Sequence, residues 1–223
     1  MNLSTNTISK IFSENCLNGE LCDIQQLLEA KEERKKCQEQ LIKKHSSTLV
    51  SVTLVTPGRI KKNYCYETLF YIIREILDDI FIKNKIKVNE SLSQFDQTGA
   101  LLLFSVDAIA SDVKVLLTNL EEEHYLGRFW DLDVINSDFK ILSRADFGRS
   151  PRKCFLCSED AKVCGRQQKH SYHELTSKIH ETLKEYIFQK TVSEMAYNAL
   201  LKEVKLTPKP GLVDLNSLSL NYL

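Results

Sequence analysis

Two aspartates near the middle of the chain have the spacing of a divalent-metal site. Asp131 and Asp133 alternate with Trp130, Leu132 and Val134, and this period of two predicts a strand with both carboxylates on one face. The carboxylates would lie about 7 Å apart, and such a pair suits a hard cation. A strand that is polar only toward solvent is the alternative, but paired acids at one strand end repel each other unless a cation is present. We therefore interpret the pair as a candidate metal site.

Glycines and basic residues at two places could hold an anionic ligand. Gly127 and Arg128 directly precede the predicted strand. Farther upstream, a strand predicted for residues 48–56 ends at a Pro-Gly turn containing Gly58, and Lys61 follows before a helix. Free backbone amides at a glycine turn and at a helix N-terminus favour phosphate, although a solvated basic loop is the commoner outcome for this pattern alone.

An arginine occupies the apolar stripe of a helix predicted for residues 21–45, whose expected N-cap is Asp23. Leu27, Arg34 and Leu41 are spaced seven apart, which places Arg34 on the packed side of the helix. Either its stem packs while its guanidinium reaches water, or it binds a phosphate or carboxylate in a cleft.

A later segment carries a set of candidate zinc ligands. The set consists of Cys154, Cys157, Cys164 and His170, and three thiolates with one imidazole could hold a structural zinc. A zinc ribbon usually brings a second short-spaced pair, so the sequence favours reduced thiols packed beside a helix start over zinc. The seven cysteines, an odd number in a lysine-rich chain, also indicate thiols rather than disulfides.

The bulk composition indicates a globular protein without a strong overall charge. The chain has 223 residues, 43% of them hydrophobic, and its 30 basic and 30 acidic residues cancel. No whole-molecule field recruits nucleic acid or an anionic membrane. The N-terminus lacks a signal-peptide pattern, and no apolar stretch approaches the ~20 residues of a membrane span. We expect a cytoplasmic protein with neither a nucleic-acid nor a membrane partner.

The order of elements predicts an α+β fold. Helical periodicity covers residues 21–45, a stretch through 69–80, another through 113–120, and 171–189, whereas strand patterns cover 48–56, 85–95, 100–106 and 130–135, with 139–142 as the hairpin partner of the last. The expected arrangement is a mixed, largely antiparallel sheet with flanking helices.

Five motifs in this order resemble a known family over residues 27–170. They are Leu27 to Arg34 with Gln38, Pro57 to Lys61, the Thr98-Gly99 turn, Glu123 to Val134, and Arg152 to Cys157 with Ala161, Cys164, Arg166 and His170. The family is apo-citrate lyase phosphoribosyl-dephospho-CoA transferase, also called citrate lyase holo-acyl-carrier-protein synthase. The resemblance implies a nucleotidyltransferase-like domain over residues 1–190.

A second resemblance begins near residue 191. Ala199 to Val204 and Leu206 to Asp214 are similar to the opening of triphosphoribosyl-dephospho-CoA synthase. Residues 191–223 would then be a truncated start of a synthase-like domain and a C-terminal helical extension, too short for synthase activity. This pattern is expected of a bifunctional fusion protein.

The first resemblance implies a specific reaction. The family transfers phosphoribosyl-dephospho-CoA from 2'-(5-triphosphoribosyl)-3'-dephospho-CoA to a serine of the citrate lyase acyl carrier (gamma) subunit and releases diphosphate. Asp131 and Asp133 would then bind Mg²⁺ and Arg128 would hold the triphosphate. The remaining substrate-binding residues would be Lys61, Gly58, Arg34, Gly127 and Arg152, with Arg149, Arg152 and Arg166 also facing the carrier.

Several alternatives stay open at this point. A third carboxylate for the metal could be Asp107, Glu123 or Asp146. The chain could be an inactive carrier-binding or regulatory remnant of a fusion protein. A zinc-stabilised nucleic-acid-binding module is disfavoured by the neutral charge and by the lack of aromatic-basic alternation.

Overall fold

Four strands form one antiparallel sheet in the computed structural model, which describes the backbone of residues 5–203 and the side chains of residues 7–193. The strands are β1 (Thr48–Leu54), β2 (Lys87–Asp96), β3 (Gly99–Asp107) and β4 (Trp130–Ile135), in the order β2-β3-β1-β4. β4 pairs with β1, so that Asp131 lies opposite Thr53 and Asp133 lies opposite Ser51. The α+β class is confirmed, and the two aspartates belong to a strand at the sheet edge.

The sheet is antiparallel throughout the described residues rather than mixed as predicted. β1 and β2 run in the same direction, but β3 lies between them and pairs antiparallel with both. Similarly, β3 and β4 run in the same direction and β1 separates them. The two crossovers through helices therefore never place parallel strands side by side. The strand pattern over residues 85–95 corresponds to the single strand β2, which begins two residues later.

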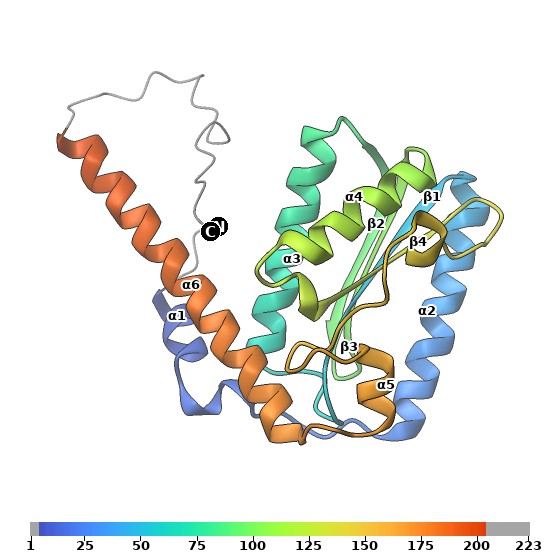
Figure 1. Ribbon diagram of the computed structural model, residues 1–223. Coiled ribbons are helices and arrows are strands. Elements are labelled where there is room, and N and C mark those ends of the chain that lie inside the picture. The colour runs from blue at the N-terminus through green and yellow to red at the C-terminus, as the bar shows by residue number, and fades with distance from the viewer. Residues whose placement is uncertain (1–4, 204–223) are drawn as a thin grey trace. The chain divides into compact units, whose positions relative to one another are not determined.

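Helices cover both faces of the sheet (Figure 1). α3 (Tyr64–Lys83) and α4 (Ala110–Glu123) pack on one face, where they share the main hydrophobic core with inward residues such as Val52 and Trp130. α2 (Ile24–His45) packs on the other face through Leu41 and Ile42. The flanking helices of the sequence prediction are thus confirmed.

α2 begins where the sequence predicts. The Asp23 carboxylate accepts a hydrogen bond from the Gln25 amide at 2.6 Å, and the Asp23 amide donates to Gln26 Oε1 at 3.0 Å, which completes a capping box. Within the helix, the Gln38 amide nitrogen donates to Ser51 Oγ of β1 at 2.8 Å. This bond fixes the level of α2 along the strand that pairs with β4.

Short elements and one long helix complete the described chain. They are α1 (Thr5–Ile11), η1 (Glu14–Leu17), η2 (Gly127–Phe129), η3 (Arg144–Phe147), α5 (Ala161–Arg166) and α6 (Tyr172–Glu203). α6 contributes Ile179, Leu183 and Ile187 to the main core, as its period predicts, and the chain divides into two contact units after Ile187. No helix within residues 5–203 combines the length and the apolar character that a membrane crossing requires.

Part of the predicted C-terminal region lies outside the described residues. Within the synthase-like stretch 191–223, residues 191–203 belong to α6. Residues 204–223 are not described, and they include Leu206 to Asp214 of the second resemblance.

The hairpin predicted between β4 and residues 139–142 forms only in part, because the chain returns antiparallel without a regular strand. These residues make one isolated bridge, Ile135 with Ile141, and a bond from the Leu142 amide to the Val134 carbonyl at 2.9 Å. Phe139 has a φ of +63°, which no regular strand contains. The chain instead turns around Asn136 and continues into η3.

Candidate functional site

β4 presents its two aspartates on the face opposite its apolar residues. Trp130, Leu132 and Val134 are buried in the main core, whereas Asp131 and Asp133 are partly exposed. The predicted alternation is therefore confirmed. The aspartates lie on the sheet face that α2 covers, because their partners Thr53 and Ser51 alternate with core residues of β1.

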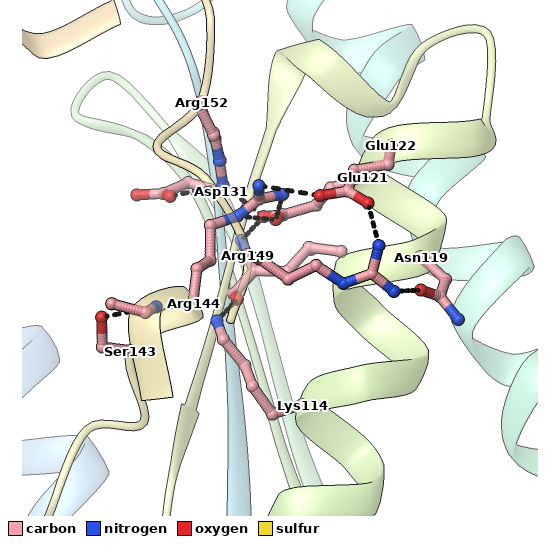
Figure 2. A network of polar contacts seen from close by, with 11 residues as sticks. Lys114, Asn119, Glu121, Glu122, Asp131, Ser143, Arg144, Arg149 and Arg152 are labelled. Atoms are coloured by element: carbon pink, nitrogen blue, oxygen red, sulfur yellow. Dashed lines mark hydrogen bonds and ion pairs between the residues drawn. The ribbon is translucent and has the colours of Figure 1, made fainter. Parts of the chain in front are cut away.

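A buried glutamate from α4 organises the polar groups around β4. Glu121 is 2% exposed, and its Oε1 accepts a hydrogen bond from the Leu132 amide at 3.0 Å. Its Oε2 accepts from Arg144 Nη2 at 2.7 Å and from Arg144 Nε at 3.2 Å. Arg152 Nη2 also donates to Glu121, and this nitrogen lies 2.9 Å from Asp131 Oδ1. Figure 2 shows how these groups converge from α4, β4 and the segment after β4.

A buried lysine completes the attachment of α4 to β4. Lys114 is 4% exposed, and its Nζ donates to the Leu132 carbonyl at 3.0 Å. Burial lowers the pKa of Lys114, while Glu121 and Asp133 oppose that shift. Together Lys114 and Glu121 bond both backbone polar groups of Leu132, so a hairpin partner has nothing to pair with there.

The two aspartates differ in their surroundings. Burial raises the pKa of the Asp133 carboxyl, and the neighbouring charge of Asp131 raises it further, whereas Lys114 and Arg152 lower it. The Asp131 side chain is 50% exposed and is paired with Arg152. The Asp133 carboxylate is thus less accessible to solvent than the Asp131 carboxylate.

Further arginines surround this network. Arg149 donates to Glu122 at 3.0 Å and to Asn119 at 2.9 Å, on the solvent side of α4. Arg128 is half-buried, and burial lowers its pKa, followed by the like charges of Arg152 and Arg144. Arg128 therefore lies within the electrostatic reach of both arginines that bind Glu121. Clustered cations of this kind match a ligand with several negative charges.

Most of the charged side chains around β4 line one cavity of about 610 Å³, whereas Arg128 is not among its lining residues. Its lining includes Lys114, Glu121, Asp131, Asp133, Arg144 and Arg152. The volume falls within the range of small-molecule sites. Asp131, Asp133 and Arg152 were predicted from the sequence, and the structure brings them together in this cavity.

Gly127 has a packing role that the sequence did not predict, and its approach to phosphate stays a prediction. A Cβ at this position would lie 2.6 Å from the carbonyl oxygens of Leu120 and Glu121. The residue must therefore be a glycine for η2 to pack against the end of α4. This packing fixes the backbone that connects Glu121 with Arg128 and β4.

The Pro-Gly loop lies at the end of the sheet where β4 begins. The Val55 amide donates to the Phe129 carbonyl of η2 at 2.9 Å, and Val55 lines the cavity. Gly58 has a φ of +67° and packs against the Tyr172 ring. The Lys61 ammonium donates to the Thr56 carbonyl at 2.6 Å, and burial lowers its pKa. Gly58 and Lys61 are thus outside the cavity lining but belong to the loop that borders it.

Arg34 lies on the same sheet face as the aspartates. It lines two neighbouring cavities, of about 250 Å³ and about 480 Å³, beside α2. Arg34 precedes Gln38 by one helical turn, and one turn advances about as far as two strand residues. Because Gln38 bonds Ser51 and α2 runs opposite to β1, Arg34 lies level with Thr53, the partner of Asp131.

Sequence reasoning missed the buried members of the network. None of the expected third carboxylates, Asp107, Glu123 and Asp146, lines the cavity. The buried carboxylate is Glu121. Its signal was present, because Val113, Leu117 and Glu121 are spaced four apart on the buried stripe of α4, and Lys114 precedes Glu121 by seven.

The candidate zinc ligands also converge. The ligand atoms of Cys154, Cys157, Cys164 and His170 all lie within 4.8 Å of one another. Arg152, which bonds Glu121 and Asp131, precedes the first of them by two residues.

The chain is similar to one family model and to several curated proteins, and the family model and one of these proteins have the same description. A family model described as apo-citrate lyase phosphoribosyl-dephospho-CoA transferase matches residues 22–186. Protein CitXG of Haemophilus influenzae is 38% identical over 203 residues, which cover 91% of this chain and 44% of that protein. Protein CitXG of Leuconostoc mesenteroides subsp. cremoris is 37% identical over 212 residues, covering 89% and 45%. An apo-citrate lyase phosphoribosyl-dephospho-CoA transferase of Shigella boydii serotype 18 is 34% identical over 160 residues, covering 72% of this chain and 87% of the relative. The chain therefore spans less than half the length of these two CitXG proteins.

Proposed function

Because the chain belongs to the apo-citrate lyase phosphoribosyl-dephospho-CoA transferase family, we propose that it attaches this prosthetic group to citrate lyase. The donor is 2'-(5-triphosphoribosyl)-3'-dephospho-CoA, and the acceptor is a serine of the acyl carrier subunit. The serine hydroxyl loses its proton to water and its oxygen forms a bond to the phosphorus nearest the ribose. The bond from that phosphorus to the next phosphate breaks, and diphosphate leaves. This is a nucleotidyltransferase-type reaction.

The observation that carries the proposal is the aspartate pair beside anchored arginines in one cavity. Asp131 and Asp133 supply oxygen ligands on one face of β4, and Mg²⁺ prefers a few carboxylates together with substrate phosphates. The residues present therefore fit this ion. Bound there, Mg²⁺ would neutralise phosphate charge and favour ionisation of the serine hydroxyl.

The arginines hold the donor phosphates. Glu121 holds Arg144 and Arg152 from a buried position, and both arginines line the cavity. A pre-oriented guanidinium loses little entropy when it binds a phosphate. Arg152 now pairs with Asp131, and we expect its guanidinium to turn to the phosphates when a cation takes that carboxylate. Arg128 adds a further charge beside them.

The outer part of the donor extends over the α2 face. Arg34 lies level with Asp131 on that face and lines two adjoining cavities. The Pro-Gly loop with Lys61 borders the same end of the sheet. These positions suit a long ligand that carries phosphate groups at more than one place.

The proposal is tested by incubating the purified chain with apo-carrier, Mg²⁺ and the triphosphate donor, and by measuring the mass of the carrier. We expect the carrier to gain the mass of the prosthetic group. Asp131→Asn and Asp133→Asn should each lower the transfer rate by at least about a hundredfold, because the metal and oriented phosphates are lost together. Asp138→Asn, an exposed aspartate in the following turn, is the matched control and should retain the wild-type rate.

Two results would contradict the proposal. Retained transfer by the double variant Asp131→Asn with Asp133→Asn would remove the metal role from this pair. A carrier whose mass stays unchanged with the wild-type chain, although the two proteins bind each other, would favour an inactive carrier-binding remnant.

A further inference from the structure

We propose that Cys154, Cys157, Cys164 and His170 bind one structural zinc ion that holds Arg152 in place. The three sulfur atoms and the imidazole nitrogen lie within 4.8 Å of one another. In a tetrahedral site with Zn–S near ~2.3 Å and Zn–N near ~2.0 Å, the ligand atoms lie about 3.5–3.8 Å apart. The cluster therefore needs only a small contraction to close around a zinc ion.

The backbone brings the first two cysteines together in a tight turn. Lys153 forms an antiparallel bridge with Asp160, and bonds from the Cys154 amide to the Glu159 carbonyl and from the Ala161 amide to the Arg152 carbonyl measure 2.7 and 2.8 Å. Inside this turn the Leu156 amide donates to Cys154 Sγ at 3.4 Å. Amide bonds to sulfur are a common outer contact of metal-bound thiolates.

The other two ligands come from α5 and from the turn after it. Asp160 caps α5 through the amides of Lys162 and Val163 at 2.8 and 3.2 Å. The helix places Cys164 in a buried position. The chain then turns through Gln168, whose φ is +49°, and brings His170 Nε2 to 3.2 Å from Cys157 Sγ.

This segment has too little apolar burial to be held by a core of its own. Between Gly148 and Ser171, Cys164 is the only buried residue. Small units with so little core usually rely on a metal or on disulfides, and no disulfide joins the seven cysteines. Free thiols, which the sequence spacing favoured, would contribute little to holding this fold. Three sulfurs and one nitrogen in a closed set are the ligands of a structural zinc rather than of a catalytic one.

The ion would act on the candidate active site through the backbone. The Arg152 carbonyl belongs to the ladder that closes the cysteine turn, while the Arg152 guanidinium bonds Glu121 and Asp131. Phe155, inside the turn, packs edge-on against Phe129 with ring centroids 5.5 Å apart. Arg152 and η2 are thus both attached to the metal-binding turn, which makes these four ligands positioning residues.

The test is the metal content of the full-length chain, purified without chelator or histidine tag. We expect about one zinc per chain, and visible absorption bands of tetrahedral thiolate coordination after replacement by Co²⁺. Cys157→Ser and His170→Ala should each lower the zinc content to less than about a fifth of that value. His170→Cys should retain it, because a fourth thiolate completes the set. Cys37→Ser, a partly exposed cysteine on α2, is the control and should bind zinc like the wild type.

The readout is independent of the transferase activity, because it needs neither carrier nor donor. If Cys157→Ser fails to fold, the metal content and the Co²⁺ spectrum of the wild-type chain decide the question alone. Two findings together would overturn the proposal. The folded wild-type chain would lack zinc after growth with added zinc, and its three clustered thiols would react with a thiol reagent as fast as Cys37.

Discussion

At the scale of single residues, Glu121 is the central charged group of the site, because it forms ion pairs with two arginines. It is buried, and it compensates Arg144 and Arg152 at the same time. Removing one member of a buried ionic group leaves the others unpaired, which costs more than the net contribution of the intact group. The residue is therefore as important for stability as for orienting the arginines.

We predict that Glu121→Gln destabilises the fold by about 3 kcal/mol, because two guanidinium groups lose their buried counter-charge. The free energy of unfolding from urea titration measures this effect. Glu123→Gln, on the exposed side of the same helix, should change stability by less than about 0.5 kcal/mol. Equal effects of the two substitutions would show that the network contributes nothing to stability.

Two glycines provide a second test at this scale. Gly127→Ala places a Cβ 2.6 Å from two backbone carbonyl oxygens, and we predict a loss of about 1–3 kcal/mol, because the backbone must shift to admit it. Gly165→Ala, inside α5 with no atom within 4 Å of the added Cβ, should leave stability unchanged or raise it by up to ~1 kcal/mol. The melting temperatures of the two variants should therefore move apart. A stable Gly127→Ala variant would contradict the close packing of η2 on α4.

At the scale of elements, α5 carries a positive charge, Arg166, that does not line the cavity. Arg149 and Arg152 were both expected to face the carrier, which stays a prediction. The structure pairs Arg149 with Glu122 on the solvent side of α4, and Arg152 with Glu121 and Asp131 in the cavity. Arg166, at the end of α5, is exposed. It is therefore the better candidate for contact with an acidic partner surface.

We predict that Arg166→Glu weakens carrier binding by about five- to tenfold at low ionic strength, with a smaller deficit at high salt, because exposed charges act mainly by steering. Association rates measured at several salt concentrations test this. The control is Arg74→Glu on α3, which is remote in sequence and pairs with Asp78. A deficit that does not depend on salt would point to misfolding of α5 rather than to lost steering.

At the scale of the whole molecule, the sequence predicted those features that depend on neighbouring residues. The Asp23 cap, the alternation in β4 and the α6 stripe were confirmed because their signals lie within one element. The network around Glu121 was missed because it joins α4 to η3 and to the segment before α5, with bonded residues 23 and 31 positions apart. The mixed sheet was wrong because no local pattern shows that β3 enters between β1 and β2.

The attachment of α4 to Leu132 has a consequence for solubility. β4 is an edge strand, and an open edge offers unpaired amides and carbonyls on which a second chain can add a strand and begin to aggregate. Glu121 and Lys114 occupy both polar groups of Leu132, and the Leu142 amide occupies the Val134 carbonyl. The charged groups that orient the arginines therefore also protect this edge against intermolecular strand pairing, so a mutation that loosens the cavity also opens a route to self-association.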